Sequence, residues 1–223
     1  MKANIDNQIL DTILDSPMAP VLLHRIQSVL DREKERRELF YNEITEQEKA
    51  EFINGEIIIH SPVKKKYTDI GLNLVQIIRA YVFEKDLGFV GFEKTLIQCT
   101  RNDYEPDICF FEKAISKDFK TDQALFPIPN FIVEILSPST EKRDRGIKFD
   151  DYQNHGVKEY WIIDPQTQTV EQFLLNKEGA FELNVKSDSG DLKSTQIPHL
   201  VIPIPVIFDE KLAHDFVKKI YQA

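Results

Sequence analysis

The sequence contains few of the residues from which several common kinds of active site are built. Only two of its 223 residues are cysteines, Cys99 and Cys109, and neither belongs to a CxxC pair, which argues against a zinc knuckle or a thiol redox motif. There are only five histidines, scattered along the chain, so a zinc site is not expected either. The motifs GxSxG, Walker A, GxGxxG and HExxH are all missing, which leaves no signature of a serine hydrolase, a nucleotide-binding protein or a zinc protease.

Long apolar runs are also missing. No stretch approaches the roughly 18 apolar residues that a transmembrane helix requires. Residues 1–6 include an acid and lack an apolar core, so we do not expect a secretory signal peptide. These absences predict a cytoplasmic protein without a membrane partner. In a reducing cytosol both cysteines are expected to be free, buried thiols.

The chain also lacks an excess of basic residues. The chain has 28 lysines and arginines against 37 acids, a formal net charge of −9. Proteins that bind nucleic acid by charge alone usually have a basic balance. The acidic balance therefore counts against a protein that coats DNA. It counts less against an enzyme, because a bound metal ion offsets the charge of its own carboxylate ligands.

The apolar pattern predicts a helical arm followed by one larger domain. The first 40 residues show apolar positions at helical spacing, interrupted by Pro17 and Pro20. Charges of alternating sign over residues 31–38 are typical of the solvated face of a helix. We therefore divide the chain into an N-terminal helical arm, residues 1–45, and a domain of residues 46–223.

Downstream of the arm, strand-like and helix-like segments alternate. Asn54-Gly55 predicts the turn of a hairpin over residues 51–60, because both positions tolerate a positive φ. The further predictions are a helix over residues 65–82, strands over 87–99, 106–111 and 131–136 with a turn at Asn102-Asp103, a helix over 140–155 with Gly146 inside it, a strand over 159–164, a hairpin over 170–185 and a helix over 210–221. The order of helix, three-stranded meander, helix and strand is that of an α/β core, with further strands and a helix on its C-terminal side.

Two acids stand in otherwise apolar strand segments. Asp107 lies near the start of residues 106–111, and Glu134 lies within residues 131–136, 27 positions later (134 − 107). A carboxylate in such a segment is costly to bury unless a cation or several donors meet it. We hypothesise that the two acids lie on neighbouring strands and hold one divalent metal ion. Two alternatives stay open: Asp107 as a turn or capping residue, and Glu134 paired with a buried arginine or lysine.

These acids belong to an ordered series of motifs that resembles the PD-(D/E)XK nuclease superfamily. The series comprises residues 54–56, 60–62, 104–107 (Tyr-Glu-Pro-Asp), 133–140, 144–148 and 156–165. The likeness spans residues 51–175 and is to a branch of uncharacterised restriction-endonuclease-like proteins. It implies a restriction endonuclease-like fold and a Mg²⁺-dependent endonuclease in which Mn²⁺ can substitute.

The resemblance also implies a set of site residues. In the superfamily the PD aspartate and the later acid bind Mg²⁺, which assigns Asp107 and Glu134 as catalytic metal ligands. The backbone carbonyl of Ile135 is a further candidate ligand, because Mg²⁺ prefers oxygen donors. The superfamily's catalytic lysine, two positions after the second acid, is replaced here by Leu136. Some members carry this lysine on the following helix, which implies Lys148; the other interpretation is a surface lysine.

Three residues are candidates for accessory roles. Glu93 precedes an apolar strand run and is either a supplementary acid or a solvated strand residue. Tyr152 lies one helical turn after Lys148 and on the same predicted face. Glu56, like Glu51, flanks the predicted hairpin turn. Both of these glutamates are expected to be exposed, which makes a site role the less favoured interpretation.

The sequence therefore favours a metal-dependent nuclease that hydrolyses phosphodiester bonds in DNA. The superfamily implies a homodimer, with the apolar, proline-punctuated residues 197–208 as a partner surface. The displaced lysine and the acidic net charge favour an alternative, a catalytically inactive nuclease-fold module for binding or interaction. A third interpretation, a small-molecule or metal-binding α/β protein without a nucleic acid partner, also stays open.

Overall fold

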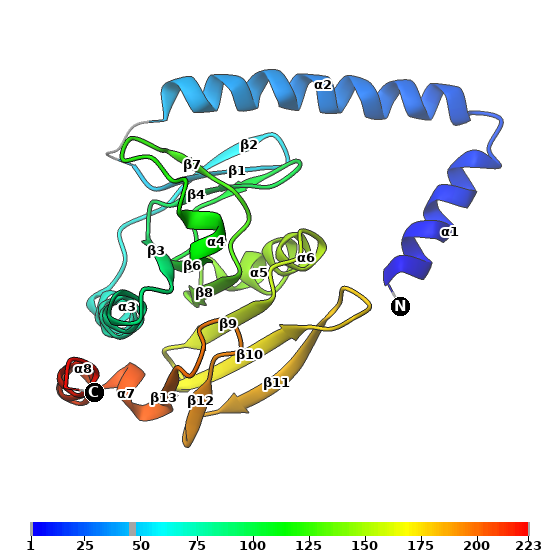
Figure 1. The fold of residues 1–223 in the computed structure, drawn as a ribbon. Helices are drawn as coiled ribbons and strands as arrows, with labels where there is room; N and C mark the ends of the chain where they lie inside the picture. Colours follow the sequence, from blue (N-terminus) through cyan, green and yellow to red (C-terminus); the bar gives the residue numbers. More distant parts are fainter. Residues whose placement is uncertain (1, 45–47, 223) are drawn as a thin grey trace.

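A computed structural model describes residues 2–44 and 48–222 (Figure 1). The predicted arm is helical and consists of α1 (Lys2–Leu14) and α2 (Ala19–Glu43). Pro20 occupies the first turn of α2, where its missing N–H would have no helical partner in any case. The predicted boundary between residues 45 and 46 lies outside the described residues.

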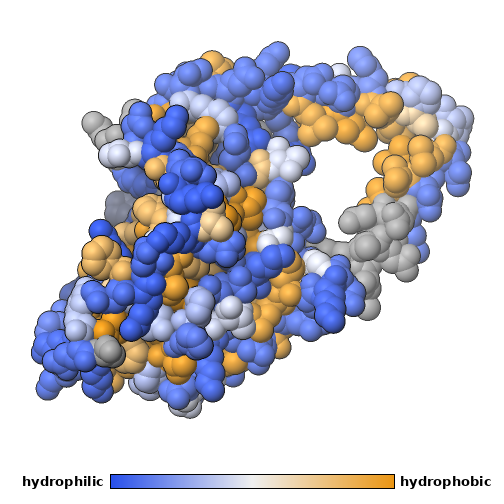
Figure 2. All heavy atoms as spheres, viewed as in Figure 1, coloured by the Kyte–Doolittle hydropathy of each residue, from blue (hydrophilic) through white to orange (hydrophobic). Residues whose placement is uncertain are grey.

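Ion pairs and hydrogen bonds tie the C-terminal half of α2 to the body. Arg37 forms an ion pair with Asp103, and Glu33 accepts two hydrogen bonds of 2.8 Å from Arg101. Towards its N-terminus the arm leaves the body, and Figure 2 shows apolar side chains on the side that faces the open space. Large apolar side chains are exposed along this part: Ile9, Leu10, Leu14, Val21, Leu23, Ile26, Val29 and Leu30.

A six-stranded sheet forms the centre of the body, in the order β11-β10-β9-β8-β6-β3. Its strands are β3 (Gly88–Phe92), β6 (Ile108–Glu112), β8 (Phe131–Ile135), β9 (Glu159–Asp164), β10 (Thr169–Leu175) and β11 (Phe181–Ser187). The antiparallel neighbours β3, β6 and β8 form the predicted three-stranded meander, and β9 adds to β8 in parallel. The predicted α/β core is thereby confirmed.

Both faces of this sheet are covered. One face packs against α3 (Lys65–Glu84), α7 (Ile204–Phe208) and α8 (Glu210–Ile220), together with the small pair β12 (Asp191–Lys193) and β13 (Val201–Pro203). The other face packs against α6 and the second sheet. Strand β8 is buried throughout, with Phe131 and Val133 in the first core and Ile132 in the second. Each large apolar side chain buried in this way contributes about 1.5–3 kcal/mol.

The residues predicted as a partner surface belong to this core. Within 197–208, the apolar side chains of Ile197, Leu200, Ile202, Ile204 and Ile207 are at most 1% exposed. They pack beneath the six-stranded sheet with α3 and α8. The assignment of this segment to a partner surface is therefore wrong, because its apolar side chains serve the chain's own interior.

A second, smaller sheet stands above the first, in the order β2-β1-β5-β4-β7 (Figure 1). Its strands are β1 (Ala50–Ile53), β2 (Glu56–Ile59), β4 (Leu96–Gln98), β5 (Asp103–Tyr104) and β7 (Leu125–Phe126). The hairpin of β1 and β2 turns at Asn54 and Gly55, whose φ angles are 49° and 81°. This is the turn that the Asn-Gly pair predicted.

The strand predicted over residues 87–99 is divided between the two sheets. It leaves the large sheet after β3 and enters the small sheet as β4. Glu93, between them, has a positive φ of 59°, a conformation that costs a non-glycine residue on the order of 1 kcal/mol. The predicted turn at Asp103 is likewise part of a strand, β5. The sequence prediction missed both features because they depend on the presence of a second sheet.

The helix predicted over residues 140–155 is broken into α5 (Glu141–Asp144) and α6 (Ile147–Asn154). Gly146 lies at the break, with φ −118° and ψ −104°. A Cβ at this position would be 2.7 Å from the carbonyl oxygen of Lys142, so only glycine allows the two helices to approach in this way. The break directs the first turn of α6 towards the sheet and buries Lys148.

The connection between β6 and β8 contains a short helix, α4 (Lys113–Ser116), besides β7. Cys99 and Cys109 are free and buried, as expected. In residues 2–44 and 48–222, no helix combines the length and the apolar character needed to cross a membrane.

Candidate active site

Asp107 and Glu134 lie opposite each other on neighbouring strands. Ile108 of β6 pairs with Val133 of β8 in an antiparallel register. One further step along this register places Asp107 directly across from Glu134, with both side chains on the same face. The backbone N–H of Ile135 donates a 2.8 Å hydrogen bond to Oδ2 of Asp107. The two acids that the sequence singled out thus meet at one edge of the meander.

Glu134 is held by two donors from α6. Its Oε1 accepts a 3.0 Å hydrogen bond from Nζ of Lys148 and a 2.9 Å hydrogen bond from the hydroxyl of Tyr152. The two donors are four residues apart, and therefore share a helix face. Burial and the Glu134 carboxylate raise the pKa of Tyr152, so its hydroxyl keeps the proton that it donates. The structure brings both donors to Glu134: Lys148, which the resemblance implied, and Tyr152, which the spacing placed on the same helix face.

Lys148 is buried among carboxylates, with only 2% of its side chain exposed. Besides Glu134, its Nζ lies 2.7 Å from Oε1 of Glu51 and 3.4 Å from Oδ1 of Asp144. Burial opposes the charged form, but these three acids outweigh it and raise the pKa of Lys148. The interpretation of Lys148 as a surface lysine is therefore wrong, because the helix break buries its whole side chain.

Glu51 was expected to be exposed and is fully buried. All four residues of β1 are buried: the strand lies between β2 and β5, Ala50 and Phe52 pack against Phe40, and Glu51 contacts Lys148 of α6. Burial alone would raise the pKa of Glu51, yet Lys148 and His60 lower it to about 2. His60 contributes through Nε2, which lies 3.0 Å from Oε2 of Glu51. Glu56, at the other end of the hairpin, is exposed and does not line the cavity at Asp107.

Lys49 is a site residue that the sequence reasoning missed. Its Nζ lies 2.7 Å from Oδ1 of Asp107 and 2.9 Å from Oε2 of Glu93, with 17% of its side chain exposed. Burial lowers the pKa of Lys49, but the nearby charges of Asp107, Glu93 and Glu134 outweigh it and raise the pKa. A lysine just before a strand carries no distinctive local signal, so only the folded chain reveals its partners. Glu93 is brought to the site by the same contact.

These side chains border a cavity of about 380 Å³. Its charged lining residues are Lys49, Glu93, Lys94, Asp107, Glu134 and Lys148. The hydroxyl-bearing side chains of Tyr67, Ser137 and Thr140 also border it. A cavity that contains both acids and two ion-paired lysines is the natural place for chemistry on an anionic substrate.

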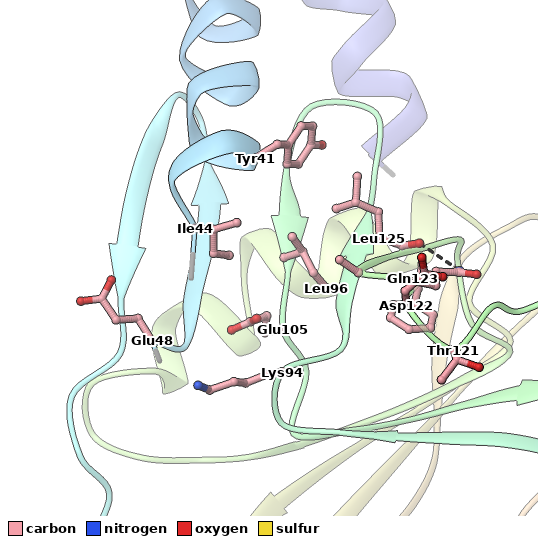
Figure 3. A pocket seen from close by; sticks show the side chains of 12 residues that line it. Tyr41, Ile44, Glu48, Lys94, Leu96, Glu105, Thr121, Asp122, Gln123 and Leu125 are labelled. Carbon is pink, nitrogen blue, oxygen red and sulfur yellow. Dashed lines mark hydrogen bonds between the residues drawn. The ribbon is translucent and has the colours of Figure 1, made fainter. Parts of the chain in front are cut away.

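A neighbouring cavity of about 450 Å³ lacks this constellation. Figure 3 shows that Tyr41, Leu96 and Leu125 line it together with Glu105. Burial raises the pKa of Glu105 to about 7, and its Oε2 accepts a 2.8 Å hydrogen bond from the backbone N–H of Ala50. Neither Asp107 nor Glu134 borders this cavity, so we place the candidate site in the smaller one.

Carboxylates cluster around two of the lysines at the site. The ammonium groups of Lys49 and Lys148 contact five of them, those of Glu51, Glu93, Asp107, Glu134 and Asp144, and Lys94 also borders the cavity. Burial raises the pKa of Glu134 to about 8, Lys148 opposes this rise, and the charges of Asp144, Asp107 and Glu51 add to it. A cation next to Glu134 would oppose this rise and favour the ionised carboxylate.

The donor set fits Mg²⁺ in its chemistry. Two carboxylates and the carbonyl of Ile135 are oxygen donors, and Mg²⁺ usually binds one or two protein carboxylates and keeps several waters. Within the described part of the chain, no three acidic, histidine or cysteine side chains form a ready metal-binding group. The proposed set contains only two such side chains and does not require one. Lys49, however, contacts Asp107 at Oδ1, where a metal ion would bind.

Comparisons with known proteins agree with this architecture. The model of the Uma2 family, described as "Putative restriction endonuclease", matches residues 35–203, and so begins in the C-terminal half of α2. The uncharacterized protein slr1290 of Synechocystis sp. (strain ATCC 27184 / PCC 6803 / Kazusa) is 29% identical over 186 residues, 82% of this chain and 91% of that protein.

The fold has a counterpart among solved structures. A crystal structure of a putative nuclease belonging to DUF820 from Anabaena variabilis ATCC 29413 matches with a TM-score of 0.65 and 21% sequence identity. The match covers 78% of this chain and 96% of that chain. This structural similarity shows that the chain has the restriction endonuclease-like fold. The chain therefore belongs to the Uma2 family of putative restriction endonucleases, within the PD-(D/E)XK restriction endonuclease-like superfamily.

Proposed function

We propose that the protein is a metal-dependent endonuclease that hydrolyses phosphodiester bonds in DNA, with Mg²⁺ as the cofactor and Mn²⁺ as a substitute. One observation carries this proposal: Asp107 and Glu134 stand across from each other at one cavity, with a lysine in contact with each. Family membership supports the reaction class. The metal, the DNA substrate and the role of each residue belong to the proposal.

In this proposal the residues of the site bind and orient the metal ion. Asp107, Glu134 and the carbonyl of Ile135 would hold the metal ion. The bound ion would lower the pKa of a water and offset charge on the phosphoryl oxygens. The N–H of Ile135 fixes one oxygen of Asp107, which orients the other towards the cavity.

Glu134 is oriented from the opposite side. Lys148 and Tyr152 both donate to its Oε1, so Oε2 is the oxygen that these donors do not occupy. The ammonium of Lys148 keeps a positive charge next to this carboxylate and favours its ionised, metal-binding form. In this proposal Lys148 acts by holding Glu134 ready and by its charge on the reacting groups.

Cleavage of supercoiled plasmid tests the proposal. The wild type is expected to nick or linearise the plasmid with Mg²⁺ or Mn²⁺ and to be inactive with EDTA. Asp107→Ala and Glu134→Ala are each expected to reduce cleavage by about 10²–10³-fold, the usual cost of losing a group that stabilises charge in the transition state.

Glu112→Ala is the matched control, because Glu112 ends β6, the strand that begins just after Asp107, and is exposed away from the cavity. It is expected to cleave like the wild type. Equal cleavage by the wild type and by both site variants would contradict the proposal, since the activity would then come from another site or another protein. A parallel assay with RNA decides between the two nucleic acids.

An inactive binding module is the second candidate. Leu136 at the usual lysine position and the net charge of −9 favour it. A gel shift with DNA without any cleavage, at saturating Mn²⁺, would support this candidate and contradict the nuclease.

The proposal also includes a homodimer. Light scattering of the intact protein tests this part, and a monomer at micromolar concentration would contradict it.

A further inference from the structure

Both carboxylate oxygens of Asp107 are already occupied in the folded chain. Oδ2 accepts from the backbone N–H of Ile135 at 2.8 Å. Oδ1, the oxygen that borders the cavity side, accepts from Nζ of Lys49 at 2.7 Å. A divalent ion at Oδ1 would lie a few ångströms from this ammonium, and the repulsion between the two cations disfavours metal binding while the ammonium stays in this position. Lys49 thus occupies a cation position in the candidate metal site.

Lys49 has a second partner, Glu93, which can hold its ammonium group after the contact with Asp107 is lost. Oε2 of Glu93 lies 2.9 Å from the same Nζ, and the side chain of Glu93 is 42% exposed, against 19% for Asp107. The positive φ of Glu93 turns the chain between β3 and β4 and brings this acid to the cavity. A flexible lysine with an exposed acceptor can leave Asp107 without losing every partner.

Lys148 does not have this freedom. Its side chain is 2% exposed and its Nζ lies within 3.4 Å of three buried carboxylates. Moving it would leave several buried charges without a counterion, which is strongly unfavourable. Of Lys49 and Lys148, only Lys49 is placed to exchange with a metal ion.

We propose that Lys49 is a built-in competitor for the metal site: its ammonium neutralises Asp107 in the metal-free protein, and a divalent ion binds only by displacing it towards Glu93. The proposal rests on the proposed function, because it uses the same metal ligands. It goes beyond that function by giving the chain's own side chain control over metal occupancy.

Direct titration of the intact protein with Mn²⁺ in a calorimeter tests the proposal without any nucleic acid. Lys49→Met removes the ammonium and keeps most of the side chain's length, so it is expected to bind Mn²⁺ at least tenfold more tightly than the wild type. Removing a like charge a few ångströms from the ion is large enough for this change. Lys49→Arg keeps the charge and is expected to stay within about threefold of the wild type.

Lys94→Met serves as the matched control, because Lys94 lines the same cavity. It changes the net charge by the same amount as Lys49→Met. A clearly smaller gain in affinity than in Lys49→Met is expected. An equal gain in both variants would mean that overall charge, and not the contact with Asp107, sets the affinity, and would overturn the proposal.

The remaining outcomes distinguish a failure of the role proposed for Lys49 from a failure of the proposed nuclease function. Lys49→Met that binds Mn²⁺ no more tightly than the wild type overturns the role of Lys49 and leaves the nuclease proposal intact. Absence of Mn²⁺ binding in both proteins overturns the metal site, and with it the proposed function. Lys49→Gln repeats the test if Lys49→Met does not fold, with far-ultraviolet circular dichroism as the check on folding.

Discussion

The two lysines beside the Asp107–Glu134 pair occupy different environments. Lys148 comes from a helix, is 2% exposed and contacts three buried acids contributed by β1, β8 and α5. Lys49 precedes β1, is 17% exposed and contacts two acids that border the cavity. The same side-chain chemistry therefore produces a fixed counterion in one place and an exchangeable one in the other.

The physical reason is desolvation. A buried charge that loses its partner costs about 3–5 kcal/mol, because no water replaces the lost contact. An ion pair open to solvent contributes only about 0–1 kcal/mol, because water and salt compete with it. The difference between the two lysines should therefore appear as a difference in stability, which the variants of Lys148, Tyr152 and Lys49 described below test.

Lys148→Met is expected to have the largest effect, a loss of about 3–5 kcal/mol in the free energy of unfolding. It would leave Glu51, Glu134 and Asp144 buried without their common cation. Urea unfolding at neutral pH measures this loss. Lys142→Met is the control, because Lys142 is exposed on the neighbouring helix α5, and it is expected to change the free energy by less than about 0.5 kcal/mol. An equally small loss in Lys148→Met would contradict the role of Lys148 as a fixed, buried counterion.

Tyr152→Phe should have an intermediate effect. The hydroxyl donates a 2.9 Å hydrogen bond to Oε1 of Glu134 and the side chain is fully buried. Leaving a buried hydrogen-bond partner unsatisfied costs about 1–3 kcal/mol, which is the loss expected in urea unfolding. An unchanged unfolding midpoint would indicate that Lys148 alone holds Glu134.

The dependence of stability on pH gives a third test. Burial raises the pKa of Glu105 to about 7, above its value of about 4.5 in the unfolded chain. Between these values the folded state keeps a proton that the unfolded state releases. The stability that this group contributes is therefore complete below pH 4.5 and is lost as the pH rises through 7.

Glu105→Gln is expected to remove this part of the decline, which is on the order of 1 kcal/mol. Thermal unfolding of the variant and the wild type at several values between pH 4.5 and 8 measures it. Glu134, whose pKa is raised to about 8, adds a decline of the same sign that persists in the variant. A slope that is identical in both proteins would contradict the titration of Glu105 in this range.

Lys49→Met should have the smallest effect on stability. Its ion pairs are partly open to solvent, and we expect a loss of less than about 1 kcal/mol in EDTA. Added Mn²⁺ should then raise the unfolding midpoint more in this variant than in the wild type, because a tighter ligand stabilises the folded state more. A loss as large as that of Lys148→Met would show that the two lysines do not differ in kind.

Much of the fold followed from local patterns along the chain. The Asn54-Gly55 turn, the meander with its crossover to β9, and the amphipathic α8 were all predicted, because apolar periodicity and turn residues act over a few neighbours. The sequence also singled out Asp107 and Glu134, since an acid in an apolar strand is conspicuous. The spacing of Lys148 and Tyr152 placed both on one helix face.

Contacts between distant segments decided the remainder. Whether Glu51 is exposed depends on β1 lying over Lys148, 97 positions later (148 − 51). The turn at Glu93 depends on a second sheet that receives β4. Lys49 reaches Asp107 only because the hairpin folds back over the meander.

The sequence alone thus determined most of the strands and helices and which acids are costly to bury, because these properties depend on neighbouring residues. Only the tertiary structure determined which cation meets each acid and how much water surrounds the pair. Burial and ion pairing arise from residues that are distant in the sequence and close in space, and no local pattern encodes them.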